Sequence, residues 1–288
     1  MTETIFQRVT RQIVESIEAG AAEFHMPRHG GGSALSCPRN AISGRAYRGV
    51  NILSLWLGAR SAGFDCGEWA TYRQWSERGG QVRKGERGCP VVFWKRQGPI
   101  DEAEDSQSNG ARFIARAYTV FNVAQVDGWS SEPAPVLSEE ERLPAVDAAF
   151  AATEAKIEHG AQSASYSPLD DCIRMPTFGR FRDADAYYAV LAHEVTHWTG
   201  AKHRLDRQLT GRFGSAAYAM EELVAELGAA FTCARLGISG EPRPDHAAYL
   251  ASWLRVLRGD PRAIFTAAGK AQEAVDYAFD PASVQSDN

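Results

Sequence analysis

The sequence predicts an α+β chain, with a mixed α/β N-terminal part followed by a mostly helical part that contains a small sheet. Long apolar patterns with helical spacing, such as Ala184–Thr199, indicate buried helices, whereas short apolar runs in the first part are typical of buried strands. Between the two parts, Gly128–Pro144 has three prolines and an acidic run, as linkers often do. We therefore expect one domain at residues 1–128, a linker at residues 129–144 and a second domain at residues 145–288.

The N-terminal part is expected to hold three helices and at least two strands. The helix at Met1–Ala19 is amphipathic, with apolar residues at helical spacing that can pack on a core. The other helices are predicted at Asn51–Ala62 and Gly67–Glu77, and the strands at Pro90–Trp94 and Arg112–Val126. The acidic segment Gln97–Gly110 between these strands is rich in turn-forming residues, which predicts a surface loop.

The C-terminal part is expected to begin with a helix, continue with two short strands and end with four helices. The first helix is predicted at Ala145–Glu158, and the strands at Ala164–Tyr166 and Cys172–Met175. The later helices are predicted at Ala184–Thr199, Ala216–Gly237, Asp245–Arg258 and Pro261–Phe279. Apolar residues recur at helical spacing in these segments, so each helix can place one face against a core.

The helix at Ala184–Thr199 contains the run His193-Glu194-Val195-Thr196-His197, which predicts a metal site. Residues four apart lie one turn above each other in an α-helix, so both imidazoles can hold the same ion. Glu194 lies beside the first histidine and is placed to take a proton from metal-bound water. This pattern is typical of a zinc-dependent hydrolase, with Glu194 as the catalytic residue and Zn2+ as the cofactor. The alternative is a surface helix with two solvated histidines, which the apolar Tyr187 and Leu191 disfavour.

Zinc held by two histidines needs a third protein ligand, and the helix at Ala216–Gly237 offers three glutamates among apolar residues. We expect Glu222 to be the ligand and Glu226 to accept a hydrogen bond from the second nitrogen of a ligating imidazole. The reverse assignment of these two residues stays open. Glu221 points about 100° away on the helical repeat, so we expect it to be solvated. The candidates for stabilising an oxyanion are Tyr218, Tyr187 and His203, which the sequence does not rank.

Composition and cysteine use favour a cytoplasmic protein. No stretch approaches the ~20 apolar residues that a membrane-spanning helix needs, and the polar N-terminus lacks the apolar region of a signal peptide. The five cysteines are odd in number and scattered, which favours reduced thiols over a disulfide framework. We expect no membrane partner and no cysteine at the metal.

Charge is unevenly distributed along the chain. Residues 1–98 contain 14 Lys and Arg against 8 Asp and Glu, whereas residues 131–288 contain 15 against 23. A basic part joined to an acidic part indicates a module that binds a polyanion beside a domain of different purpose. An accident of surface composition is an equal alternative on charge alone.

The segment Gly79–Gly88 predicts a contact with nucleic acid. Its four glycines allow close approach of the backbone, and Arg83, Lys84 and Arg87 supply positive charge for phosphates. Nearby aromatic residues on which unpaired bases could stack are Trp69, Tyr72, Trp75 and Trp94. A basic groove with stacking faces is typical of single-strand binding without sequence readout. The alternatives are burial of the aromatic residues in the core and a solvated turn for Arg83 and Lys84.

A second basic turn, Gly44–Asn51, leads into the helix predicted at Asn51–Ala62. Arg45, Tyr47 and Arg48 are expected to enlarge the DNA-binding surface, and Asn51 can cap the helix. A plain loop with a helix cap is the alternative for this turn.

Several motifs together resemble the ArdC family of antirestriction proteins, which is related to the TraC-type primases of conjugative plasmids. In the first part the matching segments are Tyr47–Asn51, Trp69–Thr71, Gly79–Glu86 and Val120–Val123. In the second part they are Asp171–Pro176, His193–Gly200, Arg204–Arg207 and Glu221–Leu227. The resemblance covers roughly residues 5–280. Phe24 stands where the family usually carries tryptophan, and Asp101–Asn109 looks like a variable insertion.

This resemblance implies a single-stranded-DNA-binding domain followed by a zincin-like metallopeptidase domain, and protection of incoming plasmid or phage DNA from host restriction. The segment around Glu222 also resembles the third-ligand helix of gluzincin metallopeptidases. We expect DNA binding and protection to be the main function. The alternative is an active, DNA-guided zinc metalloprotease whose main function is cleavage of an unknown host protein. In that case, the extended Cys172–Met175 could pair with a peptide substrate as an added strand.

Overall fold

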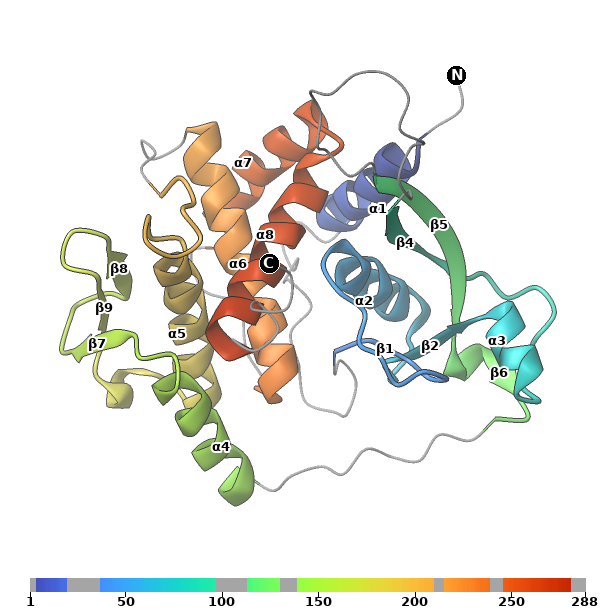
Figure 1. The fold of residues 1–288 in the computed structure, drawn as a ribbon, viewed down its shortest axis with the longest axis horizontal. Coiled ribbons are helices and arrows are strands. Elements are labelled where there is room, and N and C mark those ends of the chain that lie inside the picture. Colours follow the sequence, from blue (N-terminus) through green and yellow to red (C-terminus); the bar gives the residue numbers. More distant parts are fainter. Residues whose placement is uncertain are drawn as a thin grey trace, which may run out of the picture.

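The computed structural model describes residues 4–19, 37–96, 113–129, 139–209, 215–238 and 246–280. The fold is α+β, as the sequence predicts. Long helices of the C-terminal part lie in the middle of the molecule, with that part's small sheet on one side and the larger N-terminal sheet on the other (Figure 1).

The N-terminal part is built on a four-stranded sheet. Its elements are α1 (Ile5–Ala19), β1 (Arg39–Asn40), α2 (Val50–Ala62), β2 (Glu68–Thr71), α3 (Tyr72–Glu77), β3 (Gln81–Val82), β4 (Cys89–Arg96), β5 (Phe113–Asn122), a 3-10 turn at Val123–Gln125 and β6 (Val126–Asp127). The strand order is β1-β2-β5-β4, with β1 parallel to β2 and the other neighbours antiparallel. Strands β3 and β6 form a separate antiparallel pair.

The helix predicted at Gly67–Glu77 is wrong in its first half, which is the strand β2. Trp69 pairs with Asn122 of β5, and the pairing continues to Thr71, so the sheet overrides the helical pattern. Thr71 then caps α3: its side chain accepts from the amide of Gln74, and the Gln74 side chain accepts from the amide of Thr71.

Asn51 does not cap α2, contrary to the sequence-based expectation. The N-cap is Gly49, and Asn51 lies buried in the first turn of the helix. Its side chain donates to the carbonyl of Val92 at 2.8 Å and accepts from the amide of Val92 at 2.7 Å. Val92 belongs to β4, the edge strand of the sheet, so Asn51 satisfies backbone groups that a further strand would otherwise pair.

The C-terminal part places a three-stranded sheet beside a group of helices. Its elements are α4 (Glu139–Ala151), β7 (Lys156–His159), β8 (Ser165–Ser167), β9 (Cys172–Met175), a 3-10 turn at Phe178–Arg180, α5 (Ala184–Thr199), α6 (Ala216–Leu236), α7 (His246–Gly259) and α8 (Ala263–Phe279). The four predicted late helices and both predicted strands are confirmed.

The first helix of this part is displaced from its predicted position. It begins at Glu139, inside the segment predicted as a linker, and ends at Ala151 rather than Glu158. Glu154 then adopts a left-handed backbone conformation with φ of 58°, which redirects the chain into β7. Pairing of β7 with β9 fixes that segment as a strand.

The strand β9 cannot accept a peptide as an added strand, because both of its edges are occupied. It pairs in parallel with β7 on one side and antiparallel with β8 on the other. A substrate that extends this sheet would have to pair with the outer edge of β7 or β8.

The two parts of the chain share one hydrophobic core. Val9 and Ile13 of α1 and Trp56 of α2 belong to the same buried cluster as side chains of α6, α7 and α8, among them Leu227 and Trp253. Polar contacts reinforce this interface: Arg48 pairs with Asp276 of α8, and the amide of Gly49 donates to Gln272 at 3.2 Å. The domain boundaries predicted above therefore cross a continuous core.

The five cysteines form no disulfide, and none lies in the cluster of metal-binding side chains described below. Burial raises the pKa of the Cys89 thiol to about 11. Within the described ranges, no helix combines the length and the apolar composition that crossing a bilayer requires.

We expect the shared core to make the two parts unfold together. Trp56→Ala should destabilise the protein by about 3–5 kcal/mol, because it leaves a cavity against α6. Calorimetry should show one transition that moves as a whole, and hydrogen exchange should show weaker protection of α6 amides. Trp94→Ala, at a half-exposed position, is the control and should cost less. Two separate transitions, with only one shifted by Trp56→Ala, would contradict a shared core.

Candidate metal centre

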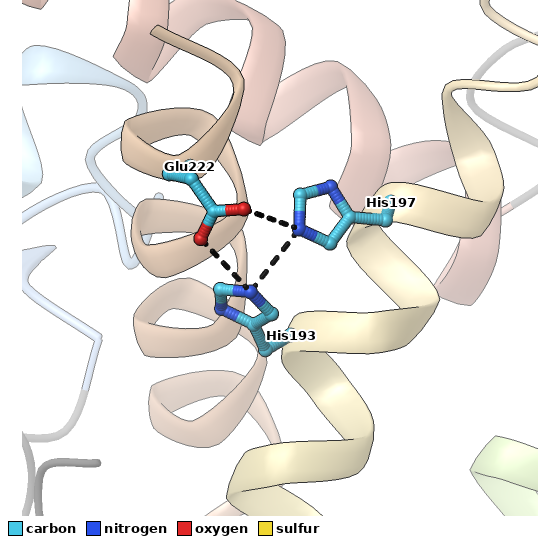
Figure 2. A group of neighbouring side chains, drawn as sticks. All are labelled: His193, His197 and Glu222. Atoms are coloured by element: carbon cyan, nitrogen blue, oxygen red, sulfur yellow. Dashed lines mark hydrogen bonds and ion pairs between the residues drawn. The ribbon is translucent and has the colours of Figure 1, made fainter. Parts of the chain in front are cut away.

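The helix α5 holds three of the predicted site residues within five consecutive positions. Asp183 caps the helix by accepting from the amide of Ala186 at 2.7 Å. His193 and Glu194 are buried, and His197 is largely buried. Both imidazoles point toward α6 and toward each other (Figure 2).

The helix α6 supplies the carboxylates, and it lies unusually close to α5. Ser215 caps it by accepting from the amide of Tyr218 at 3.2 Å. At Gly228, a Cβ atom would lie 2.4 Å from Oγ1 and 2.5 Å from Cγ2 of Thr196 on α5. Only glycine fits at this contact without movement, and the close approach brings Glu222 to the histidines.

The side chains of His193, His197 and Glu222 form a compact group whose facing atoms lie within 4.8 Å of one another. The two Nε2 atoms are 3.1 Å apart, and the Glu222 oxygens lie 3.7 Å from Nε2 of His193 and 3.6 Å from Nε2 of His197. Ligand atoms at ~2.1 Å from a tetrahedral ion are about 3.4 Å apart, so the separations fit a divalent metal. The donor set of two imidazoles and one carboxylate also suits such an ion.

Each imidazole has a further carboxylate at its Nδ1 atom. Oε1 of Glu226 lies 3.4 Å from Nδ1 of His193, and Oε1 of Glu221 lies 3.1 Å from Nδ1 of His197. The expectation that Glu221 is solvated is wrong: it is buried and also pairs with Arg207. The helical repeat alone could not reveal this, because Arg207 comes from a loop outside the helix.

Negative charge is concentrated around these histidines. Burial lowers the pKa of His197, but hydrogen bonds to Glu221 and Glu222 and the charge of Glu194 outweigh burial and raise the pKa to about 10. For Glu221, burial raises the pKa of the carboxyl, but the neighbouring His197 and Arg207 outweigh burial and bring this pKa below its usual range. The group thus favours positive charge at its centre.

The structure separates the three candidates for an oxyanion partner. Burial raises the pKa of the Glu222 carboxyl, but His197, His193 and a hydrogen bond from Tyr218 together bring this pKa below its usual range. Tyr187 instead bonds to His159 of β7 at 2.9 Å. His203 is mostly exposed and lies 3.4 Å from Asp171. Tyr218 is therefore the candidate that touches the metal-binding group.

Of the predicted stacking residues, Trp69 and Trp75 are buried in the core, as the alternative interpretation held. Tyr47 is also buried, and its hydroxyl lies 3.3 Å from the Asn40 side-chain amide. Tyr72 and Trp94 are about half exposed. Trp69 therefore offers no face to a base in this conformation.

All five predicted basic residues are exposed, and two of them pair with carboxylates. Arg83 bonds to Glu86 at 2.9 Å and to the carbonyl of Ala124 at 2.5 Å, so it holds its own turn together. Arg48 pairs with Asp276 across the core interface. The other three exposed basic residues are Arg45, Lys84 and Arg87.

Two exposed aromatic residues were missed by the sequence-based prediction. Phe93 is 48% exposed and Tyr118 is 43% exposed, and their ring centroids are 5.7 Å apart. Arg116 pairs with Phe93 across β4 and β5, so it lies on the same face. Strand alternation could have indicated this face, but the pairing register of β4 and β5 was unknown.

The chain matches two family models. One describes the N-terminal domain of anti-restriction factor ArdC and matches residues 3–121, and the other describes a zincin-like metallopeptidase and matches residues 144–270. The uncharacterized protein y4eC of Sinorhizobium fredii is 55% identical over 279 residues, which cover 95% of this chain and 91% of the relative. A DNA primase TraC of Escherichia coli is 36% identical over 97% of this chain, which spans only 27% of the primase.

Two crystal structures of the antirestriction ArdC protein from plasmid R388 share this fold. The metal-free structure has a TM-score of 0.80 and 41% sequence identity, and the match covers 98% of this chain and 99% of that one. The Mn(II)-bound structure has a TM-score of 0.76 and 40% identity, over 95% and 96% of the two chains.

We expect Gly228→Ala to disturb the centre through helix packing alone. The added methyl must push α6 away from Thr196, which should cost about 1–3 kcal/mol and weaken Mn2+ or Zn2+ binding, because Glu222 moves away from the histidines. Thermal unfolding and metal titration measure the two effects. Gly269→Ala is the matched control, since a Cβ there meets nothing within 4 Å inside α8. Unchanged metal affinity in Gly228→Ala would contradict this account.

Proposed function

The chain belongs to the ArdC family of antirestriction proteins, and on that basis we propose that it binds single-stranded DNA and protects incoming plasmid or phage DNA from host restriction. The match of residues 3–121 to the ArdC N-terminal domain supports this proposal most directly. The primase that matches 97% of this chain also acts on DNA, as its name states. The cytoplasm, where such DNA meets restriction enzymes, is the compartment that this function requires.

The proposed DNA-binding surface is the β4–β5 face, which we define as Phe93, Tyr118 and Arg116. Two half-exposed rings in contact give flat apolar surfaces on which unpaired bases can stack, and stacking does not depend on sequence. Arg116 lies directly opposite Phe93 and two residues before Tyr118 on β5, so it can contact phosphate or a base. The buried ring of Tyr47 packs against Phe93, with ring centroids 6.4 Å apart. Arg45, two residues before Tyr47, is therefore a further candidate contact for DNA. Lys84 and Arg87 are the other candidates.

In the C-terminal part, we propose that His193, His197 and Glu222 hold a divalent metal ion, with Zn2+ as the expected ion. When bound, such an ion supplies a Lewis acid that polarises a carbonyl and makes water more acidic. Glu194 is buried next to His193 and would take the proton from that water. Tyr218 would donate a hydrogen bond to an oxyanion, and Glu226 would hold His193 in place.

The alternative function is proteolysis of a host protein, with DNA as a guide. One observation favours it: Glu194 is kept beside the metal-binding group, and a purely structural metal site needs no base. A peptide substrate would then approach the free edge of β7 or β8, since β9 is already paired on both sides.

We expect Phe93→Ala with Tyr118→Ala to weaken binding of an oligo(dT) strand by at least tenfold, because each lost stacking contact costs about 1–3 kcal/mol. The salt dependence of binding should keep its slope, since no charge is removed. Arg116→Ala should instead reduce that slope. Fluorescence anisotropy across a salt series measures both quantities. Leu169→Ala, at a fully exposed turn position, is the control. If Arg83→Ala with Lys84→Ala abolishes binding and the ring variants do not, the surface is elsewhere.

The two functions differ in what restriction of incoming DNA requires. With matched expression, we expect cells carrying Glu194→Ala to keep their protection and cells carrying Phe93→Ala with Tyr118→Ala to lose it. The readout is the efficiency of transfer of unmodified DNA into a restricting host. The opposite pattern, loss with Glu194→Ala alone, would establish that the metal centre does the required chemistry.

A further inference from the structure

A guanidinium group is buried directly behind the metal-binding group. Arg207 lies in the loop that follows α5, and its side chain is only 4% exposed. Its Nε and Nη2 atoms donate to Glu221 at 3.1 and 3.0 Å, and its Nη1 atom donates to the hydroxyl of Thr199 at 2.9 Å. Nη2 also donates to the carbonyl of Thr196. A charge buried this deeply is retained only where its partners satisfy it.

The end of α5 is built to admit this side chain. Gly200 caps the helix, and a Cβ atom there would lie 2.8 Å from Nη2 and 3.0 Å from Cζ of Arg207. The loop folds back on the helix through two backbone bonds, from Leu205 to Thr199 at 3.0 Å and from Arg207 to Gly200 at 3.0 Å. The guanidinium therefore enters the space between α5 and α6 from a loop that is hydrogen-bonded to the end of α5.

The contacts of Arg207 continue to the metal-binding group through Glu221. One oxygen of Glu221 faces Arg207 and also lies 3.1 Å from Nδ1 of His197. When Nδ1 of His197 donates to this carboxylate, Nε2 is left with its lone pair toward His193 and Glu222. His193 has a carboxylate in the equivalent place, Glu226, at the longer distance of 3.4 Å.

We propose that Arg207 and Glu221 are positioning residues for the metal ion: Glu221 orients His197, and Arg207 holds Glu221 in that orientation. The inference rests on the proposed metal site. Glu221 and Glu222 lie on opposite ring nitrogens of His197, at Nδ1 and Nε2. Without the guanidinium, Glu221 would lose the partner that satisfies its charge in the interior, so it would turn toward solvent and free the His197 ring. Residues that orient a ligating histidine in this way typically contribute ~10- to 100-fold to metal affinity.

The chain offers a matched control in the same loop. Arg204 is also buried, with 8% of its side chain exposed, and it pairs with Asp171 at 2.9 and 2.6 Å while lying over the ring of Trp198. It resembles Arg207 in burial and in having a carboxylate partner. However, its hydrogen bonds go to Asp171 and to the carbonyl of Trp198, and not to His197 or the glutamates of α6.

The test is the affinity of the full chain for Zn2+, measured by competition with a chelator and repeated with Mn2+. Arg207→Met and Glu221→Gln should each weaken metal binding ~10- to 100-fold, whereas Arg204→Met should leave it unchanged. Circular dichroism confirms that each variant is folded, and Glu221→Gln keeps the test decisive if Arg207→Met does not fold. In the Co2+-loaded protein, the visible absorption of the metal should shift in Arg207→Met and stay constant in Arg204→Met.

Three outcomes are informative. Weaker binding in Arg207→Met and Glu221→Gln alone supports the positioning role. Equal metal affinity in all variants overturns it and leaves the metal site intact. Failure of the wild-type chain to bind either metal would overturn the proposed site itself. The same holds if His193→Ala binds metal as tightly as the wild type, because this variant lacks a proposed ligand.

Discussion

The close contact of α5 with α6 determines the chemistry of the C-terminal part. Thr196 rests against Gly228 with no room for a methyl group, and its hydroxyl is satisfied by the carbonyl of Ala192 within its own helix. This contact lets two histidines from one helix meet carboxylates from the other at 3.1–3.7 Å. A buried group with this many carboxylates is unfavourable unless positive charge lies among them. Arg207 provides one such charge, and a divalent ion at the histidines would provide the larger share.

The same helices connect this centre to the N-terminal part. One face of α6 carries the glutamates, while Leu223 and Leu227 on the helix belong to a core that also includes Trp56 of α2. The N-terminal sheet is attached to α2 through the Asn51 contact with the edge strand β4. The proposed DNA-binding face on β4 and β5 is therefore joined to the metal centre by packed side chains throughout. Such packing gives a coupling between the two sites a physical route.

Local patterns predicted the features whose cause is local. The helical repeat places His193 and His197 on one face of α5, and capping signals mark where α5 and α6 begin and end. Both helices could therefore be predicted from the sequence. Contacts between distant segments could not. Glu221 is buried because Arg207 reaches it from another segment, and Trp69 lies in a strand because β5 pairs with it. Asn51 has the residue type of a helix cap, yet it serves an edge strand whose position no local pattern specifies.

Several basic side chains of the N-terminal part already have a carboxylate partner. Arg48 and Arg83 are held by carboxylates, and Arg39 pairs with Glu68 at 2.6 Å. A phosphate that bound one of these groups would have to compete with the existing partner, so each contributes less to the release of counterions from DNA. The rings of Phe93 and Tyr118 need no such exchange, because they are exposed already. The proposed binding of a single strand should therefore depend more on base stacking than on the net charge of the sequence.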